Sequence, residues 1–519
     1  MPLTNRQKNI LTASATSLFF FLMHGYRFFH PLLAGDSLYM LYQDDIAWQI
    51  SLGRFAQPLF LLLRGSFPSP FLTSLLSVSA VAASAVLCTR FLSLEDPVSL
   101  VMTGAVMSCN LTLLVAGSGF LPWFDLYAFA LLSAVAGTLL LTHKKKSHLV
   151  CGVLLLVLSL GLYQAYICVA TGLVMLTFLA DAAKGEDIRA LLKKLFRTVL
   201  LFFCAALLYV LVWRFLQGAL RIATAESYHG LSSLGDFSET SVAEALFVTY
   251  RNVFRYFFAQ TPFLTPDVSG LSLGILWSVL LAACCALMLL LSVMYLAQLN
   301  RAQKTAPLSR ILQLVTILLF PLGINLVCFL SRGMEHALMM YACQLVFLAA
   351  VCIRELALPG RDDTTAPSGT SLIQKTRRLL PLLLAVITWS QIVFGNQIYY
   401  RRDQTERASF ALMNRIVDRI EETPGYEPGT TPVAFCGSFA KNPHTARPAV
   451  FSEADDILPG HTAFSYPGTE ATYLSFFESM DLTVIRFDED NGAVRAMPLF
   501  PAEGSVALID GVIVVKVSD

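Results

Sequence analysis

An adjacent pair of carboxylates, Asp44 and Asp45, is the part of the sequence best suited to chemistry. One carboxylate of such a pair can accept the proton of a reacting hydroxyl as a general base, while the other orients that hydroxyl or holds a cation. The alternative is that both side chains only solvate a loop or cap a helix predicted over residues 46–52. Because Gly53 and Arg54 follow within one helix length, we favour a catalytic role for the pair.

Arginine is the second candidate group. Apolar segments alternate with connections along the chain. The connections predicted to lie on one side of these segments contain arginine but no lysine: Arg27, Arg54, Arg64, Arg221, Arg251, Arg255 and Arg332. A planar guanidinium can hold phosphate or carboxylate through two parallel hydrogen bonds. The alternative is that few basic residues are tolerated on this face and happen to be arginine. Arg251 and Arg255 would share one face of a helix, and their aromatic neighbours suit a helix lying in the membrane interface.

Further polar side chains occur where apolar segments end on the same face. A cleft between helix ends is expected to gather them: Asp125, Tyr163, Gln164, Tyr166, Arg332, Glu335 and His336. Ionisable groups at such positions are functional candidates, because their burial costs several kcal/mol unless they are paired. The alternative for Tyr163 and Tyr166 is an aromatic belt, and for Arg332 and Glu335 a simple pair at a helix end.

The elements that must position these residues are mostly apolar. Of the 519 residues, 55% are hydrophobic and only 14% are charged, and the mean hydropathy is +0.62. Because globular domains carry about 25% charged residues, an ordinary soluble enzyme is excluded. The net charge of +1, from 37 basic and 36 acidic residues, gives no overall field that would attract nucleic acid.

Apolar runs of about 20 residues predict an all-α polytopic membrane protein with about eleven transmembrane helices. They lie near residues 8–24, 70–90, 97–117, 124–142, 149–163, 165–181, 198–217, 271–297, 311–330, 334–353 and 379–397. Basic clusters, including residues 144–146 and 184–197, place one set of loops in the cytoplasm by the positive-inside rule. The N-terminus is then cytoplasmic and the C-terminus extracytoplasmic. We expect the protein to lie in the inner (cytoplasmic) membrane.

The same pattern predicts the domains. A membrane domain spans residues 1–397, with long outer loops at 24–69 and 216–270, and a small extracytoplasmic α/β domain spans 398–519. In this tail we expect a helix at 401–422, strands at 431–435, 482–487, 505–509 and 511–517, and a helix at 471–480.

Several motifs are absent. The sequence contains no Walker loop, dinucleotide fingerprint, G-x-S-x-G elbow or H-E-x-x-H helix. No cytoplasmic loop exceeds about 25 residues, too short for a nucleotide-binding domain. The cysteines lack spacings typical of a disulfide framework or a zinc site. A single-step substitution needs no metal if arginines neutralise a phosphate, so we expect no required metal. The alternative is a divalent cation (Mg or Mn) at Asp44 and Asp45.

Short motifs spread over nearly the whole chain carry a family resemblance: Tyr42-Gln43-Asp44-Asp45 followed by Gly53-Arg54, then Tyr163-Gln164-Ala165-Tyr166, and Asp510-Gly511-Val512-Ile513-Val514-Val515-Lys516. In these motifs the chain resembles the serotype-converting glucosyltransferase II family, whose members are polytopic and related to the GT-C glycosyltransferases. The resemblance implies that a hexose, glucose, moves from a polyprenyl-phosphate donor to a cell-surface glycan such as an O-antigen.

On this hypothesis, Asp44 or Asp45 is the base of an inverting transfer at the outer face, and Arg54, Arg251, Arg255 and Arg332 bind the donor phosphate. The residues expected to contact sugar or acceptor are Tyr42, Asp125, Tyr163, Gln164, Tyr166, Glu335 and His336. The partners are the lipid-linked donor, the glycan acceptor and the lipid bilayer, without nucleic acid.

Two other functions compete with this hypothesis. One is a non-enzymatic glycolipid flippase or transporter, although transporters usually show repeat symmetry and ionisable groups near the bilayer midplane. The other is a polymerase or ligase that moves whole oligosaccharides on a similar scaffold.

Overall fold

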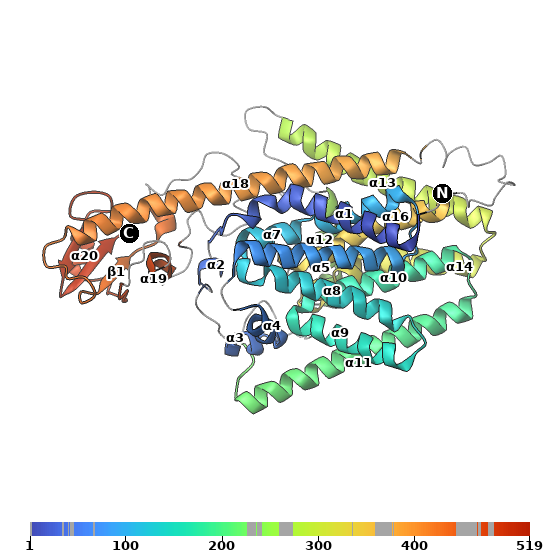
Figure 1. The fold of residues 1–519 in the computed structure, drawn as a ribbon, viewed down its shortest axis with the longest axis horizontal. Helices are drawn as coiled ribbons and strands as arrows, with labels where there is room; N and C mark the ends of the chain where they lie inside the picture. The colour runs from blue at the N-terminus through green and yellow to red at the C-terminus, as the bar shows by residue number, and fades with distance from the viewer. Residues whose placement is uncertain are drawn as a thin grey trace.

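The computed structural model describes residues 3–33, 36–39, 41, 46–65, 68–225, 235, 241–258, 273–334, 336–358, 376, 378–442, 464, 469–475 and 482–519. These residues form a bundle of helices and a small α/β domain, which lies beyond one end of the bundle at the tip of a long helix (Figure 1).

Long helices make up most of the bundle. They are α1 (Asn5–His24), α5 (Pro70–Phe91), α6 (Pro97–Ser108), α7 (Leu111–Gly119), α8 (Phe124–Leu141), α9 (Lys146–Leu162), α10 (Ile167–Ala183), α11 (Ile188–Leu220), α12 (Val242–Phe258), α13 (Leu273–Ala302), α14 (Pro307–Ile324), α16 (Leu345–Ala357) and α18 (Leu379–Glu421). Short helices connect them: η1 (Gly25–Phe28), α2 (Asp36–Tyr39), α3 (Ile46–Ser51), α4 (Ala56–Arg64), η2 (Leu121–Trp123), η3 (Gln164–Tyr166), α15 (Leu326–Leu330), η5 (Ala337–Met339) and η6 (Tyr341–Gln344).

The described helices give fewer candidate membrane spans than the hydropathy pattern predicts. Among the described residues, 7 helices are long and apolar enough to cross a bilayer, or up to 8 if the bent pair α6 and α7 counts as one span. The apolar helix α9 is shorter, with 17 residues. Helices do occupy each range in which a span was predicted, but the count of about eleven spans stays a prediction.

A single polar residue explains the bend between α6 and α7. The side chain of Asn110 accepts a hydrogen bond from Leu113 N at 2.9 Å and donates one to Met107 O at 3.2 Å. It therefore caps α7 and satisfies a carbonyl at the end of α6, so the chain can turn by 40° without leaving these backbone groups unpaired.

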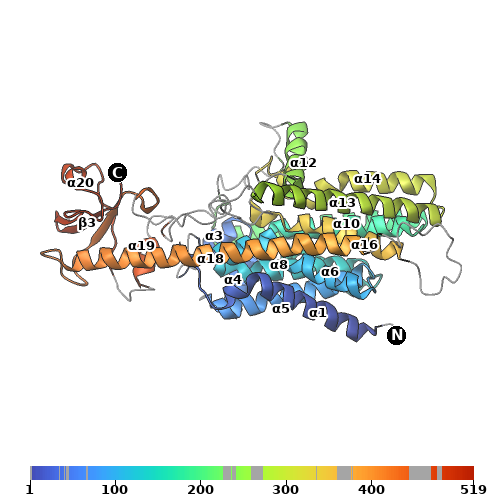
Figure 2. The ribbon, with the colours of Figure 1, turned by 90° about the horizontal axis from the view of Figure 1, so that it is seen from above.

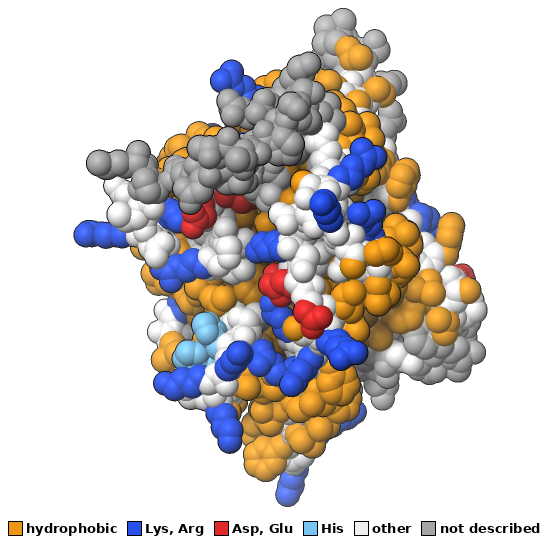
Figure 3. All heavy atoms as spheres, turned by 90° about the vertical axis from the view of Figure 1, so that its right-hand side faces the viewer, with side chains coloured by type: hydrophobic (Ala, Val, Ile, Leu, Met, Phe, Trp, Pro, Cys, Tyr) orange, Lys and Arg blue, Asp and Glu red, His pale blue; other side chains and the backbone are white. Residues whose placement is uncertain are grey.

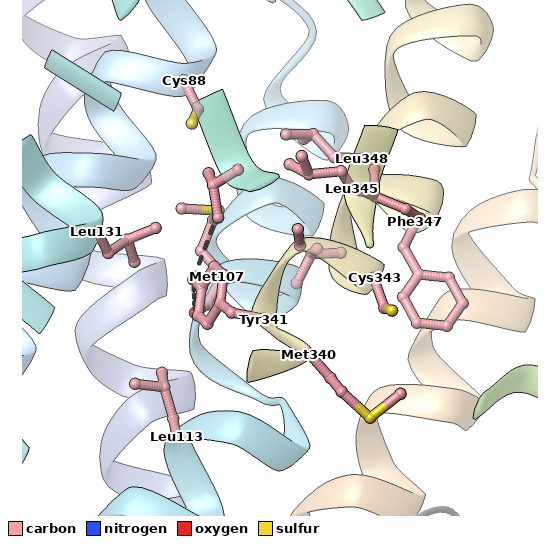
Figure 4. Packing of buried hydrophobic residues seen from close by; sticks show 14 of the residues in the cluster. Cys88, Met107, Leu113, Leu131, Met340, Tyr341, Cys343, Leu345, Phe347 and Leu348 are labelled. Carbon is pink, nitrogen blue, oxygen red and sulfur yellow. Dashed lines mark hydrogen bonds between the residues drawn. The ribbon is translucent and has the colours of Figure 1, made fainter. Parts of the chain in front are cut away.

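The core of the bundle is packed with apolar and aromatic side chains from distant parts of the chain. Figure 4 shows Tyr341 and Phe347 among leucine, methionine and cysteine side chains, with the Tyr341 hydroxyl donating to Met107 O at 2.8 Å. Both rings are buried. The connection before α16 is thereby fixed against the α6–α7 bend.

The two ends of the bundle differ in charge. Lys and Arg side chains are spread over the end that contains the N-terminus (Figure 3). Loops predicted to be cytoplasmic meet there: Lys8 pairs with Glu95 at 2.8 Å, and Arg354 pairs with Asp96 at 2.9 Å. The α/β domain lies beyond the opposite end (Figure 2). This separation agrees with the predicted orientation, although the side of the membrane on which each end lies stays a prediction.

The helix predicted over 401–422 is not a separate element. It forms the outer part of α18, which continues without a break for 43 residues from the bundle into the tail (Figures 1 and 2). The chain between Gly395 and Pro424 contains neither glycine nor proline, so nothing local stops the helix where its composition changes from apolar to charged.

The tail contains a sheet of three strands, β1 (Val433–Cys436), β2 (Val506–Ile509) and β3 (Val512–Lys516), in the order β1-β3-β2. Strands β1 and β3 are parallel, whereas β2 and β3 form a hairpin. Its turn residues Asp510 and Gly511 have φ angles of 50° and 79°, as a type I′ turn requires. Short helices complete the domain: η7 (Phe439–Lys441), α19 (Thr469–Tyr473) and α20 (Gly492–Ala496).

One prediction for the tail needs correction, and another extends beyond the described residues. The strand predicted at 482–487 is reduced to a single parallel bridge between Val433 and Val484. The helix predicted at 471–480 is represented by α19, which ends at Tyr473, and residues 476–480 lie outside the described part.

Candidate functional site

The Gly53–Arg54 motif forms the turn between α3 and α4. Gly53 has a φ of +78° and follows the last turn of α3. Its N–H donates to Ile50 O at 3.0 Å, and Arg54 N–H donates to Gln49 O at 2.8 Å. This is the Schellman arrangement, in which a left-handed residue, usually glycine, ends a helix. The glycine therefore fixes where Arg54 leaves the helix.

Side chains from two other elements clasp this turn. Trp213 Nε1 donates to Ile50 O at 2.6 Å, and Gln164 Nε2 donates to Leu52 O at 2.6 Å. Tyr209 Oη donates to Gly53 O at 3.2 Å. The C-terminal carbonyls of a helix need partners outside the helix, and here α11 and η3 supply them. We call Gln164, Tyr209 and Trp213 the clasp.

The clasp also explains why residue 53 is a glycine. A Cβ on Gly53 would lie 2.2 Å from Tyr209 Oη and 2.9 Å from Gln164 Nε2. Gln164 Nε2 in turn donates to Tyr209 Oη at 3.0 Å. Two motifs that were predicted separately, Gly53–Arg54 and the polar break at 163–166, are thus brought into direct contact.

Arg54 lies on an aromatic platform. Its guanidinium carbon is 5.0 Å from the centroid of the Tyr163 ring, within the range of a cation–π contact. The Tyr163 ring packs against Tyr127 at 4.6 Å and Tyr166 at 6.1 Å, and Tyr166 packs against Tyr341 at 5.7 Å. Tyr163 and Tyr166 are buried whereas Arg54 is half-buried. The guanidinium of Arg54 therefore contacts a ring that is itself held in place by other tyrosine rings.

Asp125, a predicted sugar or acceptor residue, is instead the partner of an arginine. Arg64 Nη1 lies 2.9 Å from Asp125 Oδ1, and the two side chains are 2% and 0% exposed. Arg64 Nη1 also donates to Pro122 O at 3.3 Å. Asp125 Oδ2 and Arg64 Nη2 have no hydrogen-bond partner within the described part of the chain. The pair joins α4 to the start of α8, and a contact between Asp125 and a sugar stays a prediction.

The connection that carries Arg332 and His336 approaches the same end of the bundle. His336 Nδ1 accepts a hydrogen bond from Leu338 N at 3.2 Å, and its ring meets Phe120 edge-on at 5.9 Å. The following helix η5 packs beside η3. Arg332 is half-buried in a turn with a φ of +58°, and that turn packs on α12. His336 thus lies near the polar break, while Arg332 lies toward α12.

Arg251 and Arg255 share one face of α12, as predicted. Both side chains are exposed, whereas Val253 and Tyr256 are buried on the other face. The Tyr256 hydroxyl accepts a hydrogen bond from Gln344 Nε2 at 2.6 Å. Described contacts do not join these arginines to Arg54, so their membership in one phosphate site stays a prediction.

Other members of the predicted arginine set serve the fold. Arg27 is fully buried and donates through Nη1 to the carbonyls of His30 and Pro31. Arg221 ends α11 in the left-handed conformation, with a φ of 55°. Arg64 is paired with Asp125, whereas Arg54, in the first predicted motif, contacts Tyr163 of the second.

Part of the predicted site lies outside the described residues: Tyr42, Asp44, Asp45 and Glu335. Within the described residues, no group of three or more His, Cys, Asp or Glu side chains is arranged to hold a metal ion. Since Asp44 and Asp45 lie outside these residues, a cation at this pair stays an alternative.

Sequence reasoning missed two residues that build this site, Tyr209 and Trp213. A signal for both was present. Tyr209, Trp213 and Gln217 recur every four residues in the otherwise apolar α11 and are its buried side chains in that stretch, which marks one face of the helix. The pairing of Arg64 with Asp125 gave no comparable signal, because the two residues lie far apart in the sequence.

One of the comparisons with known proteins identifies a family. No curated protein matches the chain, and no solved structure matches it. A family model described as glucosyl transferase GtrII matches residues 25–352, which include the turn at Gly53, the clasp and the helix α12. Since this match covers more than half of the sequence, the chain belongs to the GtrII glucosyl transferase family.

Proposed function

We propose that the protein transfers glucose from a polyprenyl-phosphate donor to a cell-surface glycan at the outer face of the cytoplasmic membrane. Membership of a glucosyl transferase family supports glucosyl transfer, and several helices long enough to span a bilayer support a multi-pass membrane enzyme. The donor, the acceptor and the side of the membrane are the parts that this proposal adds.

The observation that carries the proposal is the position of Arg54 on Tyr163, beside the clasped turn at Gly53. The ring holds the guanidinium in place through the cation–π contact, and a guanidinium can bind a phosphate through two parallel hydrogen bonds. Arg54 is half-buried, where the field of its charge is screened less than in bulk water. These features suit the phosphate of a lipid-linked donor.

The charge distribution supports the outer face. The end of the bundle rich in Lys and Arg faces the cytoplasm by the positive-inside rule. The turn at Gly53 lies between α3 and α4, toward the opposite end, where the tail domain is found (Figure 1). A donor carried by a membrane lipid reaches that end without a nucleotide-binding domain, for which the sequence has no motif.

The proposed reaction is a single displacement. The acceptor hydroxyl oxygen attacks the anomeric carbon while the bond from that carbon to the phosphate oxygen breaks, so the configuration inverts. Asp44 or Asp45 accepts the hydroxyl proton. Arg54, with Arg251 and Arg255 reaching from the interface, stabilises the charge on the departing lipid phosphate.

The remaining predicted residues complete the proposed site. Tyr163 and Tyr166 act as the platform for Arg54, and Gln164 fixes the turn. Arg332, which lies toward α12, is proposed to bind the donor phosphate with Arg251 and Arg255. His336, Tyr42 and Glu335 are proposed to contact the sugar or the acceptor.

The test is a reconstituted assay. The purified protein in proteoliposomes is given polyprenyl-phosphate glucose and an acceptor glycan, and mass spectrometry measures the hexose added. Replacing the catalytic base by asparagine, Asp44→Asn or Asp45→Asn, should lower the rate about 10²- to 10⁴-fold. Asp418→Asn is the matched control, because this carboxylate is exposed on the outer part of α18. Unchanged transfer in both variants would overturn the proposed mechanism.

The same assay separates the competing functions. Movement of the donor across the bilayer without an added hexose would indicate a flippase, and a changed chain length would indicate a polymerase or ligase. Because arginines neutralise the phosphate in the proposal, transfer should persist in chelator. Loss of transfer that magnesium or manganese restores would instead place a divalent cation at Asp44 and Asp45.

A further inference from the structure

A short stretch of the first outer loop lies between the bundle and the tail domain. Its buried side chains are Leu33, Ser37, Leu38 and Leu41, which we call the wedge. Ser37 and Leu38 are 0% exposed, although they belong to α2, a helix of only 4 residues. So short a helix cannot bury its own side chains, so the burial comes from elements packed on both sides.

On the bundle side, the wedge is held by hydrogen bonds. Ser37 Oγ donates to Gly119 O at 2.8 Å and accepts from Leu121 N at 2.9 Å. These backbone groups lie where α7 ends and η2 begins. One buried hydroxyl therefore satisfies a donor and an acceptor at the helix end, which fixes α2 to the bundle.

On the tail side, the wedge is part of a hydrophobic core. Leu33, Leu38 and Leu41 belong to one buried cluster with side chains of α18, η7, α19 and β3, including Ile416, Phe439, Tyr473 and Ile513. Helix α2 packs directly beside α19. We call this cluster the tail core. The tail domain thus completes its own core with residues from the first outer loop.

We propose that the tail domain positions the catalytic loop of this enzyme by holding the wedge. Asp44 and Asp45 follow Leu41 after two intervening residues and precede Ile46, the first residue of α3. Helix α3 is held by the clasp, and Leu41 is held by the tail core. The chain that bears the acidic pair is therefore anchored at both ends, and one anchor belongs to the tail domain. The inference rests on the proposed function for the role of the pair.

This role differs from a tail domain that only recruits the acceptor. A recruiting domain would raise the acceptor KM when it is damaged and leave kcat unchanged. A positioning domain would lower kcat, because a misplacement of about 1 Å at a reacting group can cost about 100-fold in rate. The split between kcat and KM therefore distinguishes the two roles.

The experiment uses full-length protein with the substitutions Leu38→Ala and Leu41→Ala. The matched control is Val494→Ala, since Val494 is buried in a second cluster of the same domain that contains no wedge residue. We expect the wedge variants to lower kcat about 10- to 100-fold, with donor and acceptor KM changed less than about twofold. The control should keep kcat within about twofold of wild type. Leu38→Met, which conserves the side-chain volume that Leu38→Ala removes, should have nearly the wild-type kcat.

Amide hydrogen exchange gives a second readout that needs no activity. Peptides covering residues 37–53 should exchange about tenfold faster in the wedge variants than in wild type or in Val494→Ala. Unchanged exchange, or a kcat lowered equally by Val494→Ala, would overturn the positioning role with the proposed function intact. Full transfer by Asp44→Asn and Asp45→Asn would instead refute the catalytic role of the pair and with it the proposed function.

Discussion

The tightest contact around the candidate site yields the sharpest prediction. Gly53→Ala adds a Cβ that would lie 2.2 Å from Tyr209 Oη and 3.3 Å from Trp213 Cε2. We expect the substitution to lower the free energy of unfolding and to raise the donor KM, because the turn that carries Arg54 must shift away from the clasp.

The magnitude has two parts. A residue with a Cβ in the left-handed region costs about 1–2 kcal/mol. Crowding in a packed region, including displacement of the Tyr209 hydroxyl from its hydrogen bonds, adds about 1–3 kcal/mol. The expected loss for Gly53→Ala is therefore about 2–5 kcal/mol, which is large for one added methyl group.

A control that isolates the first part is present in the same chain. Gly185 follows α10 in the same Schellman arrangement, with Gly185 N donating to Ala182 O and Glu186 N donating to Asp181 O. Its φ is +79°, and a Cβ on it would have nothing within 4 Å. Gly185→Ala should therefore cost only the backbone part, about 1–2 kcal/mol.

The assay is equilibrium unfolding by SDS in mixed micelles, for Gly53→Ala, Gly185→Ala, Tyr209→Phe and the double variant Gly53→Ala/Tyr209→Phe. Removing the hydroxyl relieves the shortest contact, so the double variant should be more stable than the sum of the two single effects predicts, by about 1–2 kcal/mol. Equal destabilisation by Gly53→Ala and Gly185→Ala, with no coupling to Tyr209, would refute the account of the clasp.

Other predictions follow from single contacts. Arg64→Met leaves the carboxylate of Asp125 buried without its partner, so it should lower the free energy of unfolding by about 3–5 kcal/mol, and Arg64→Met/Asp125→Leu should recover most of that loss in the same SDS titration. Arg54→Lys keeps the charge but loses the planar fork that binds phosphate through two hydrogen bonds, so the donor KM should rise about 3- to 30-fold, whereas Tyr163→Phe, which keeps the ring, should leave it nearly unchanged. Burial raises the pKa of the Cys436 thiol, which lowers the thiolate fraction near neutral pH; maleimide labelling followed by mass spectrometry should therefore be slow in the folded protein and fast after unfolding, and rapid labelling of the folded protein would contradict this packing.

Local patterns in the sequence predict much of the helical bundle. Apolar runs locate the helices, and the polar break at Tyr163–Tyr166 separates α9 from α10 as expected. The Asp510–Gly511 dipeptide lies in the turn of the only hairpin in the described sheet. Such features depend on residues close together in the chain, and their signals are therefore visible without a structure.

The contacts that build the site are not local. Arg64 and Asp125 are far apart in sequence, and each alone is an ordinary charged residue at a helix end. The clasp joins the turn at Gly53 to Tyr209 and Gln164, and only the fold brings these residues together. The continuity of α18 was missed for the opposite reason, since the change from apolar to charged residues after position 400 indicates a boundary while the helix-forming tendency persists.

The unbroken helix α18 also makes the tail domain mechanically sensitive to the bilayer. At 1.5 Å per residue, its 43 residues extend about 65 Å, so a tilt of about 10° would swing its far end by about 11 Å. Transmembrane helices adjust their tilt to the thickness of the hydrocarbon layer. Small changes of tilt within the lipid therefore become larger displacements of the tail domain, so lipid composition is a variable that reaches this domain through α18, in addition to its contact with the wedge.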